Sequence, residues 1–248
     1  MIKESPRIIS IDTPWNEKSL QVKSNEILNV IYTEENQLDS LIDQFEENCV
    51  NNKVQLSVCR TNNIELIEKL LHIGYLKCEI SLEVFSSLRN FEKYPTKGKI
   101  TIAEYNQVYL KEIKAFAYND FHFGRFLEDV NIEKHLARKR TELWIDDLNN
   151  DPTINCLLGM AKEKFIGCMF YKVFDNKVEL ILGGVKNSYA HLAQEFWMEV
   201  INRLSFANSI ASVISASNPS IINLYSELGF KFRKSVIGLH KHRNFDTI

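Results

Sequence analysis

The hydrophobic and polar positions of the chain follow two periods, which together predict a mixed protein of strands and helices. Short apolar or alternating runs predict strands, and apolar residues three and four positions apart predict helices. In the first part the predicted strands cover residues 8–11, 25–33, 54–60 and 79–85, and the predicted helices cover 37–48 and 64–73. In the second part the strands cover 99–103, 154–161, 165–174, 178–185, 209–215, 231–234 and 236–242, and the helices cover 106–117, 132–148, 191–206 and 219–228.

A polar segment separates these two parts. Residues 88–98 contain Pro95 and Gly98 and have no apolar period, which is typical of a connection between domains. A chain of 248 residues can form one large domain or two small ones. We therefore expect an N-terminal domain over residues 1–90 and a C-terminal domain over residues 98–248.

One segment of each part resembles the other. Residues 63–75 read NIELIEKLLHIGY and residues 218–230 read NPSIINLYSELGF, with a constant offset of 155 from Asn63 to Asn218 and from Gly74 to Gly229. Any helix that an asparagine caps and a glycine ends would look similar for local reasons. The flanking strands in both copies favour instead a duplicated structural unit.

Composition and charge exclude several classes of function. The 30 basic and 32 acidic residues give a net charge of -2, so no global positive field attracts nucleic acid or an anionic membrane. The five cysteines form no C-x-x-C pair, which indicates reduced thiols and neither a disulfide framework nor a zinc site. Without a secretory apolar segment or a membrane-spanning run, we expect a soluble cytoplasmic protein.

A motif near the C-terminus carries a family resemblance. Residues 218–230 match N-x-x-A-x-x-L-Y-x-x-L-G-F at Asn218, Leu224, Tyr225, Leu228, Gly229 and Phe230. This motif and the order of elements over roughly the last 150 residues resemble the GNAT family of acyl-CoA-dependent N-acyltransferases. The resemblance implies an α+β (α/β) fold with a central mixed, mostly antiparallel sheet flanked by helices, preceded by a shortened GNAT-like half. It also implies a transferase that uses acetyl-CoA as co-substrate.

Tyr225 is the candidate catalytic residue. An amine that attacks a thioester needs a polarised carbonyl and an acid that protonates the departing thiolate. A tyrosine with an ordinary pKa near ~10 can donate that proton, and the resemblance implies this role for Tyr225. The first copy has Leu70 at the matching position and cannot supply it. The alternative is a helical tyrosine that packs on the sheet with its hydroxyl at the surface.

The segment expected to bind the donor departs from the family pattern. The family motif Q/R-x-x-G-x-G/A binds pyrophosphate through backbone amides, and it falls on residues 188–193, where Ser188 and His191 replace two usual residues. Backbone amides can still bind phosphate there, or the site has decayed or accepts another acyl group. Asn218 either contacts the donor or only caps its helix. The candidate cofactor-binding residues are Gly183, Gly184, Val185, Ser188, Tyr189, Ala190, His191, Leu192, Ala193 and Asn218.

The acceptor is expected to bind at residues 115–130. The aromatic run there, the ELWIDDL segment that follows and the N-terminal half-domain are similar to the dTDP-fucosamine acetyltransferase group, which implies a nucleotide-linked amino sugar as acceptor. Phe121 would stack on it and Arg125 would pair with the diphosphate. Alternatively, the aromatic side chains fill the space between helices and sheet, and Arg125 pairs with Glu128 or Asp129.

Two histidines on the last predicted strand complete the candidates. His240 and His242 share a face, but no third ligand is near in the sequence, so we expect edge-strand histidines and no metal.

Two functions follow as hypotheses. The first is an N-acetyltransferase that transfers an acetyl group to a primary amine of a small molecule by direct attack in a ternary complex. The second is a non-catalytic GNAT-like protein that binds a ligand or partner. Exposed strands near the C-terminus could pair in a homodimer.

Overall fold

Two compact units make up the chain, and they interleave along the sequence. The computed structural model describes residues 5–245. Unit 1 comprises Met1–Ser81, Phe123–Arg140 and Ser235–Ile248, and unit 2 comprises Leu82–His122 and Thr141–Lys234. Three elements pass from one unit into the other: β4 (Leu76–Ser87), α5 (Lys134–Asn150) and β10 (Lys231–His242). The division into domains 1–90 and 98–248 follows the order of the chain and stays a prediction.

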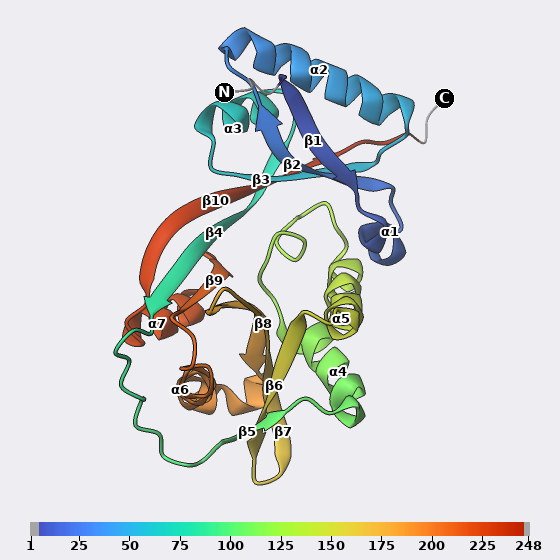
Figure 1. Cartoon of the computed structure of the whole chain (residues 1–248). Coiled ribbons are helices and arrows are strands. Elements are labelled where there is room, and N and C mark those ends of the chain that lie inside the picture. Colours follow the sequence, from blue (N-terminus) through green and yellow to red (C-terminus); the bar gives the residue numbers. More distant parts are fainter. Residues whose placement is uncertain (1–4, 246–248) are drawn as a thin grey trace. The chain divides into compact units, whose positions relative to one another are not determined.

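Unit 1 is a mixed sheet with the long helix α2 on one face (Figure 1). A hydrophobic cluster of side chains lies on each face of this sheet. Its elements are β1 (Arg7–Asp12), α1 (Pro14–Leu20), β2 (Ser24–Ile31), α2 (Glu35–Asn51), β3 (Leu56–Thr61) and α3 (Ile64–His72), and its strand order is β1-β2-β3-β10-β4. β2 runs parallel to β3, whereas β1 with β2 and β3 with β10 are antiparallel. Along β3 the side chains alternate, so Cys59 packs with α2 and α3 while Leu56 and Val58 pack on the other face.

Unit 2 is a mostly antiparallel sheet between two layers of helices. Its elements are β5 (Thr101–Glu104), α4 (Leu110–Asp120), β6 (Ile154–Ala161), β7 (Lys164–Phe174), β8 (Lys177–Val185), α6 (Ala193–Arg203), β9 (Ser209–Ser215) and α7 (Pro219–Glu227), and its strand order is β4-β9-β8-β7-β6-β5. α6 and α7 pack on one face, and α4 and α5 on the other. The fold class, a mixed and mostly antiparallel sheet flanked by helices, is thus confirmed.

Two hairpin turns explain why the three antiparallel strands β6, β7 and β8 could be predicted from the sequence. Lys162 and Glu163 connect β6 to β7, and Asp175 and Asn176 connect β7 to β8, all four with positive φ. Two consecutive residues of positive φ match the right-handed twist of paired strands. The polar residues between these three predicted strands therefore form tight turns.

Two parts of the prediction differ from the observed elements, and one observed helix was not predicted. Residues 231–242 form one strand, β10, and not two, because Ser235 continues the extended backbone. The helix predicted from residue 191 begins at Ala193, after a 3-10 helix over Asn187–Leu192. α1 was not predicted, because its sequence PWNEKSL is mostly polar; its buried residues include Asn16 and Ser19.

The two copies of the repeated segment begin in the same way. The side chain of Asn63 accepts a hydrogen bond from the backbone N–H of Leu66 at 3.1 Å, at the start of α3. The side chain of Asn218 accepts one from the N–H of Ile221 at 3.2 Å, at the start of α7. Each asparagine satisfies a backbone donor that the first turn of a helix leaves unpaired.

The copies also end in the same way. Gly74 has φ 94° and Gly229 has φ 74°, a left-handed conformation that glycine adopts without strain. The following strands, β4 and β10, have bounds that differ by the offset of the repeat at both ends. The similarity therefore extends from the helix cap to the end of the next strand.

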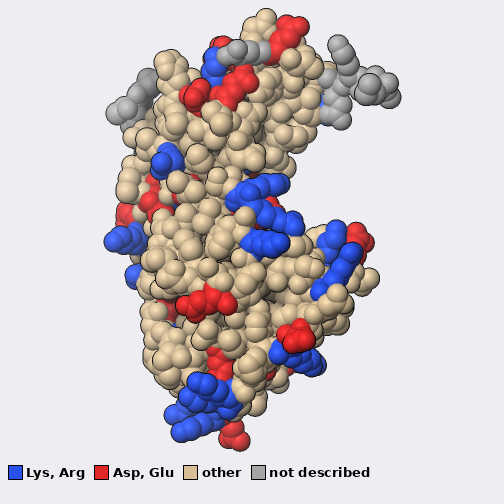
Figure 2. Space-filling view, turned by 90° about the vertical axis from the view of Figure 1, so that its left-hand side faces the viewer, with Lys and Arg blue, Asp and Glu red and all other residues tan. Residues whose placement is uncertain are grey.

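The distribution of charge on the surface and the character of the helices are relevant to binding of nucleic acid and membranes. On the face that Figure 2 shows, basic and acidic side chains each lie in several separate groups. Among residues 5–245, no helix combines the length and the apolar character that crossing a bilayer requires.

Candidate functional site

β8 and β9 run parallel over a short distance and then separate. Lys177–Leu180 pair with Ser209–Ser212, but the described pairing stops there although β8 continues to Val185 and β9 to Ser215. The other edge of β8 stays paired with β7 up to Val185. Backbone groups on the β9 side of residues 181–185 are therefore left for another partner, because unpaired strand edges accept added chains.

Ser212 lies at the point of separation. Its hydroxyl donates a hydrogen bond to the carbonyl oxygen of Leu180 on the neighbouring strand at 3.0 Å. Ser212 is also buried. Ser212 is the middle one of three serines in β9, and this polar position inside the strand was the signal that could have marked it in the sequence.

Tyr225 places its hydroxyl beside Ser212. The tyrosine is 2 % exposed, and its ring meets the rings of Phe230 at 4.7 Å and Trp197 at 6.4 Å. The pKa of Tyr225 is raised above its ordinary value, mainly by burial. Interactions with Trp197 and Ser212 offset part of this increase. The alternative of a surface hydroxyl is wrong, since α7 turns this side chain into the core.

Trp197 contributes an unsatisfied donor to the same region. Its indole Nε1 is buried and makes no hydrogen bond of good geometry among the described residues, although it lies close enough to the Tyr225 hydroxyl to lower the pKa of that group. A buried N–H without an acceptor is costly in a folded protein, and such groups often await a ligand or water. The sequence reasoning missed Trp197, which reads as a core residue of α6.

The segment before α6 carries the expected phosphate-binding residues. Ser188, Ala190 and His191 are exposed, whereas Leu192 is buried. Neither the 3-10 helix nor α6 has a side-chain cap at its start. However, the N–H of Asn187 donates to the carboxylate of Asp120 at 3.1 Å, so a protein anion already occupies one amide of this segment.

The glycines at the end of β8 allow close packing. A Cβ on Gly183 would lie 2.5 Å from Sδ of Met169, and one on Gly184 would lie 3.1 Å from Cε1 of Phe121. Phe121 also meets Phe116, with ring centroids 4.9 Å apart. Phe121 thus packs against β8 from α4, and its role in acceptor binding stays a prediction.

Asn218 and Arg125 both have partners within the protein. Asn218 caps α7, as the capping alternative predicted, and among the described residues nothing accepts from its amide nitrogen. Arg125 binds Glu26 through both guanidinium nitrogens, at 2.7 and 3.1 Å. The expected alternative partners, Glu128 and Asp129, were wrong, because a carboxylate 99 residues away in the sequence binds Arg125.

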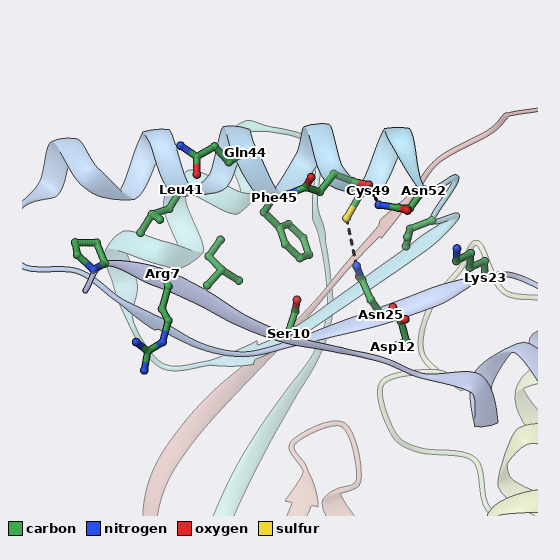
Figure 3. A pocket seen from close by; sticks show the side chains of 14 residues that line it. Arg7, Ser10, Asp12, Lys23, Asn25, Leu41, Gln44, Phe45, Cys49 and Asn52 are labelled. Atoms are coloured by element: carbon green, nitrogen blue, oxygen red, sulfur yellow. Dashed lines mark hydrogen bonds between the residues drawn. The ribbon is translucent and has the colours of Figure 1, made fainter. Parts of the chain in front are cut away.

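A polar cavity of about 470 Å³ lies elsewhere, in unit 1 between α2 and strands β1 and β2 (Figure 3). Asn25 donates from Nδ2 to Sγ of Cys49 at 3.2 Å, and its buried Oδ1 has no partner among the described residues. Arg7 and Asp12 come from β1, and Lys23 precedes β2. No predicted site residue lines this cavity.

Comparison with known proteins shows the fold of the chain. No protein-family model matches it, and neither does any curated protein. A conserved protein of unknown function from Staphylococcus epidermidis is 12% identical with a TM-score of 0.67, covering 92% of this chain and 89% of that chain. A GCN5-related N-acetyltransferase from Sphaerobacter thermophilus is 13% identical with a TM-score of 0.65, covering 96% and 78%.

A tandem GNAT protein from the clavulanic acid biosynthesis pathway is also similar. It is 6% identical with a TM-score of 0.59, covering 88% of this chain and 75% of that chain. At these identities the likeness concerns the fold, which is that of GCN5-related N-acetyltransferases. The narrower resemblance to dTDP-fucosamine acetyltransferases has no counterpart among these neighbours.

Proposed function

We propose that the protein is an N-acetyltransferase that transfers an acetyl group from acetyl-CoA to a primary amine of a small molecule. The observation that carries this proposal is the separation of β8 from β9 directly beside the buried hydroxyl of Tyr225. A site of this kind offers unpaired backbone groups for an extended donor arm and an acid at its inner end. The fold of the neighbours supports the same reaction class.

The residues present fit a thioester donor. Backbone groups of residues 181–185 would pair with the amides of the donor arm, and the unpartnered Nε1 of Trp197 offers a donor close to Tyr225. Acetyl-CoA supplies the acetyl group as a thioester. Because Tyr225 is buried, the arm has to enter between the two strands to reach it.

Tyr225 acts at the end of the reaction. The amine forms a bond to the carbonyl carbon, and the carbon–sulfur bond breaks to leave a thiolate. The Tyr225 hydroxyl gives that thiolate its proton. Burial keeps the hydroxyl protonated until this step, and the interactions with Trp197 and Ser212, which lower its pKa, favour the release of the proton. The proton that the amine loses passes through water or a backbone carbonyl and finally restores the tyrosine.

The segment of residues 188–193 would hold the pyrophosphate of the donor. Its backbone amides, with the side chains of Ser188 and His191, supply donors at the start of α6. The carboxylate of Asp120 would have to release the N–H of Asn187, or phosphate would bind the amides that follow it. The acceptor class, a nucleotide-linked amino sugar, is supported by the sequence resemblance alone.

The repeat supports a further part of the proposal. Equivalent caps and equivalent left-handed glycines indicate that the two strand–helix–strand segments arose by duplication within the chain. The second copy would then carry the chemistry, and the first would be a structural copy.

Calorimetric titration with acetyl-CoA, followed by a thiol-release assay with a panel of amines, tests the proposal. We expect saturable binding that Ser188→Asp weakens, because the added carboxylate repels pyrophosphate. Ser40→Asp adds the same charge on α2 in unit 1 and should bind as the parent protein does. The absence of both heat and thermal shift at millimolar acetyl-CoA would exclude the enzyme and favour a ligand-binding protein, for which the unit 1 cavity is the candidate site.

A further inference from the structure

Three potential metal ligands come together in unit 1, and a fourth residue, His242, contacts one of them, Asp129. Oδ2 of Asp129 lies 2.6 Å from Nδ1 of His240 and 2.7 Å from Nε2 of His242. Cys78 joins them from β4, since one ligand atom each of Cys78, Asp129 and His240 lie within 4.8 Å of one another. Four atoms bound tetrahedrally to zinc lie about 3 to 4 Å apart, so small side-chain movements would close this cluster around an ion.

The topology explains why the sequence did not indicate this cluster. β10 lies between β3 and β4 in the strand order, so the prediction that His240 and His242 lie on an edge strand was wrong. The sequence near the two histidines did not indicate a further ligand. Asp129, in the segment before α5, and Cys78, on β4, supply the further ligands from distant parts of the chain.

The carboxylate of the cluster is buried, and the nearby guanidinium of Arg125 pairs with Glu26. The side chains of Asp129 and His240 are 1% and 0% exposed. Among the described residues, no lysine or arginine forms an ion pair with Asp129. Two imidazole groups, of His240 and His242, contact the same carboxylate oxygen. A buried carboxylate beside two imidazole nitrogens is a favourable ligand for a cation.

One atom of the cluster also lacks a partner. Nε2 of His240 is buried and makes no hydrogen bond within the described part of the chain. The carboxylate, in contrast, is held in place, because the N–H of Asn131 donates to Oδ1 of Asp129 at 2.9 Å. The ring of Phe126, 5.1 Å from that of His240, provides an apolar wall. A fixed carboxylate and an apolar surround are typical of a metal site.

We propose that Cys78, Asp129, His240 and His242 bind one zinc ion. One sulfur, one oxygen and two imidazole nitrogens form a ligand set that suits zinc better than magnesium or calcium, which prefer oxygen. On binding, the thiol of Cys78 releases its proton to solvent, and each imidazole keeps one N–H on the nitrogen that does not bind. The thiolate and the carboxylate then balance the two charges of the ion.

Without an ion the same residues form only a hydrogen-bonded cluster. Burial and the carboxylate of Asp129 raise the pKa of Cys78 to about 12, so the free protein keeps a thiol there. A bound cation reverses this preference. With four protein ligands the site has no open position, which indicates a structural role: the ion joins β4, the segment before α5 and β10. The proposal is independent of acetyl transfer.

The first test measures metal content and the absorption of the cobalt-substituted protein. We expect one zinc ion per chain, removed by a chelator, and a thiolate-to-cobalt charge-transfer band after replacement by Co²⁺. Cys78→Ser should abolish that band, while Cys49→Ser, which removes another thiol of unit 1, should retain it. No metal bound at stoichiometric concentration, or a band that persists in Cys78→Ser, would overturn the proposal.

The second test follows the melting temperature of the full chain with and without a chelator. His242 is partly exposed, so His242→Gln should fold, which far-ultraviolet circular dichroism checks. The chelator should lower the melting temperature of the parent protein and have little effect on His242→Gln. His135→Gln replaces an exposed histidine on α5 and should respond as the parent does. Equal responses of the parent protein and His242→Gln would contradict zinc binding.

Discussion

The segments β3-α3-β4 and β9-α7-β10 have the same backbone interactions and different side chains. After the helix, the N–H of Tyr75 donates to the carbonyl oxygen of Leu70 at 3.0 Å, and the N–H of Phe230 donates to that of Tyr225 at 2.9 Å. The asparagine and glycine at the helix ends fix this geometry. The comparison shows that backbone geometry restricts which residues can stand at the ends of the helix. The buried position inside the helix is less restricted and holds Leu70 in one copy and Tyr225 in the other.

The copies also differ around their asparagine caps. Nδ2 of Asn63 donates to the hydroxyl of Tyr32, which in turn donates to Glu65, both at 2.8 Å. Asn218 has no equivalent chain among the described residues. The first copy therefore uses the polar groups of its cap internally, while the second leaves an amide available for a ligand.

The largest expected effect comes from removing the hydroxyl that only the second copy has. Tyr225→Phe should lower turnover in the thiol-release assay by about 10²- to 10⁴-fold, the usual contribution of a general acid. Binding of acetyl-CoA, measured by calorimetry, should change little. Leu70→Met alters the matching position of the first copy and should keep full turnover. Unchanged turnover in Tyr225→Phe would remove this residue from the mechanism.

The residue that follows the glycine differs between the copies. In the first copy this residue, Tyr75, contacts an ionic cluster around Glu46. Tyr75 donates to Glu46 at 3.2 Å, whereas Phe230, at the matching position, has no hydroxyl. Glu46 also accepts from Arg243 at 2.7 Å and Lys241 at 2.6 Å. Burial alone would raise the pKa of Glu46, but these two cations lower it below its ordinary value of 4.5.

The second prediction concerns stability and pH. The pKa of Glu46 is lower in the folded protein than in the unfolded chain. The ionised carboxylate therefore stabilises the fold at pH values above the pKa of the unfolded chain, and this stabilisation is lost as the pH falls through the pKa of the folded protein. Glu46→Gln should therefore lower the free energy of unfolding by about 2 to 3 kcal/mol at neutral pH, and by less in acid. Urea unfolding at both pH values measures this. Glu227→Gln, on the exposed face of α7, should cost under about 0.5 kcal/mol; equal costs would contradict the prediction.

Local interactions explain the parts of the fold that the sequence predicted. The hairpin turns depend on residues next to each other, such as Asp175 and Asn176, and the helix caps depend on residues three positions apart. The break predicted inside β10 was wrong because the pairing of Ile237–His242 with β3 is decided by a strand far away in the sequence. Hydrogen bonding to a distant strand overrides the local pattern.

The candidate site was predictable only where a motif marked it. Tyr225 could be identified from its motif, but its burial beside Ser212 depends on how α7 packs on the sheet. The partner of Arg125 was missed because Glu26 lies on another element, far from it in the sequence. The same holds for Cys78 and Asp129 around His240. Contacts between distant segments leave no periodic signal along a chain.

The smallest expected effect compares the two caps. Asn218→Ala should lower the free energy of unfolding by about 1 kcal/mol, the usual cost of losing an N-cap. Asn63→Ala loses the same cap and also the hydrogen bond to Tyr32, so it should cost about 2 kcal/mol in total. Paired urea unfolding curves measure the difference. In Tyr32→Phe the extra cost of Asn63→Ala should disappear, because the acceptor is already gone. An equal cost for both caps would mean that the hydrogen bonds through Tyr32 and Glu65 add no stability to the first copy.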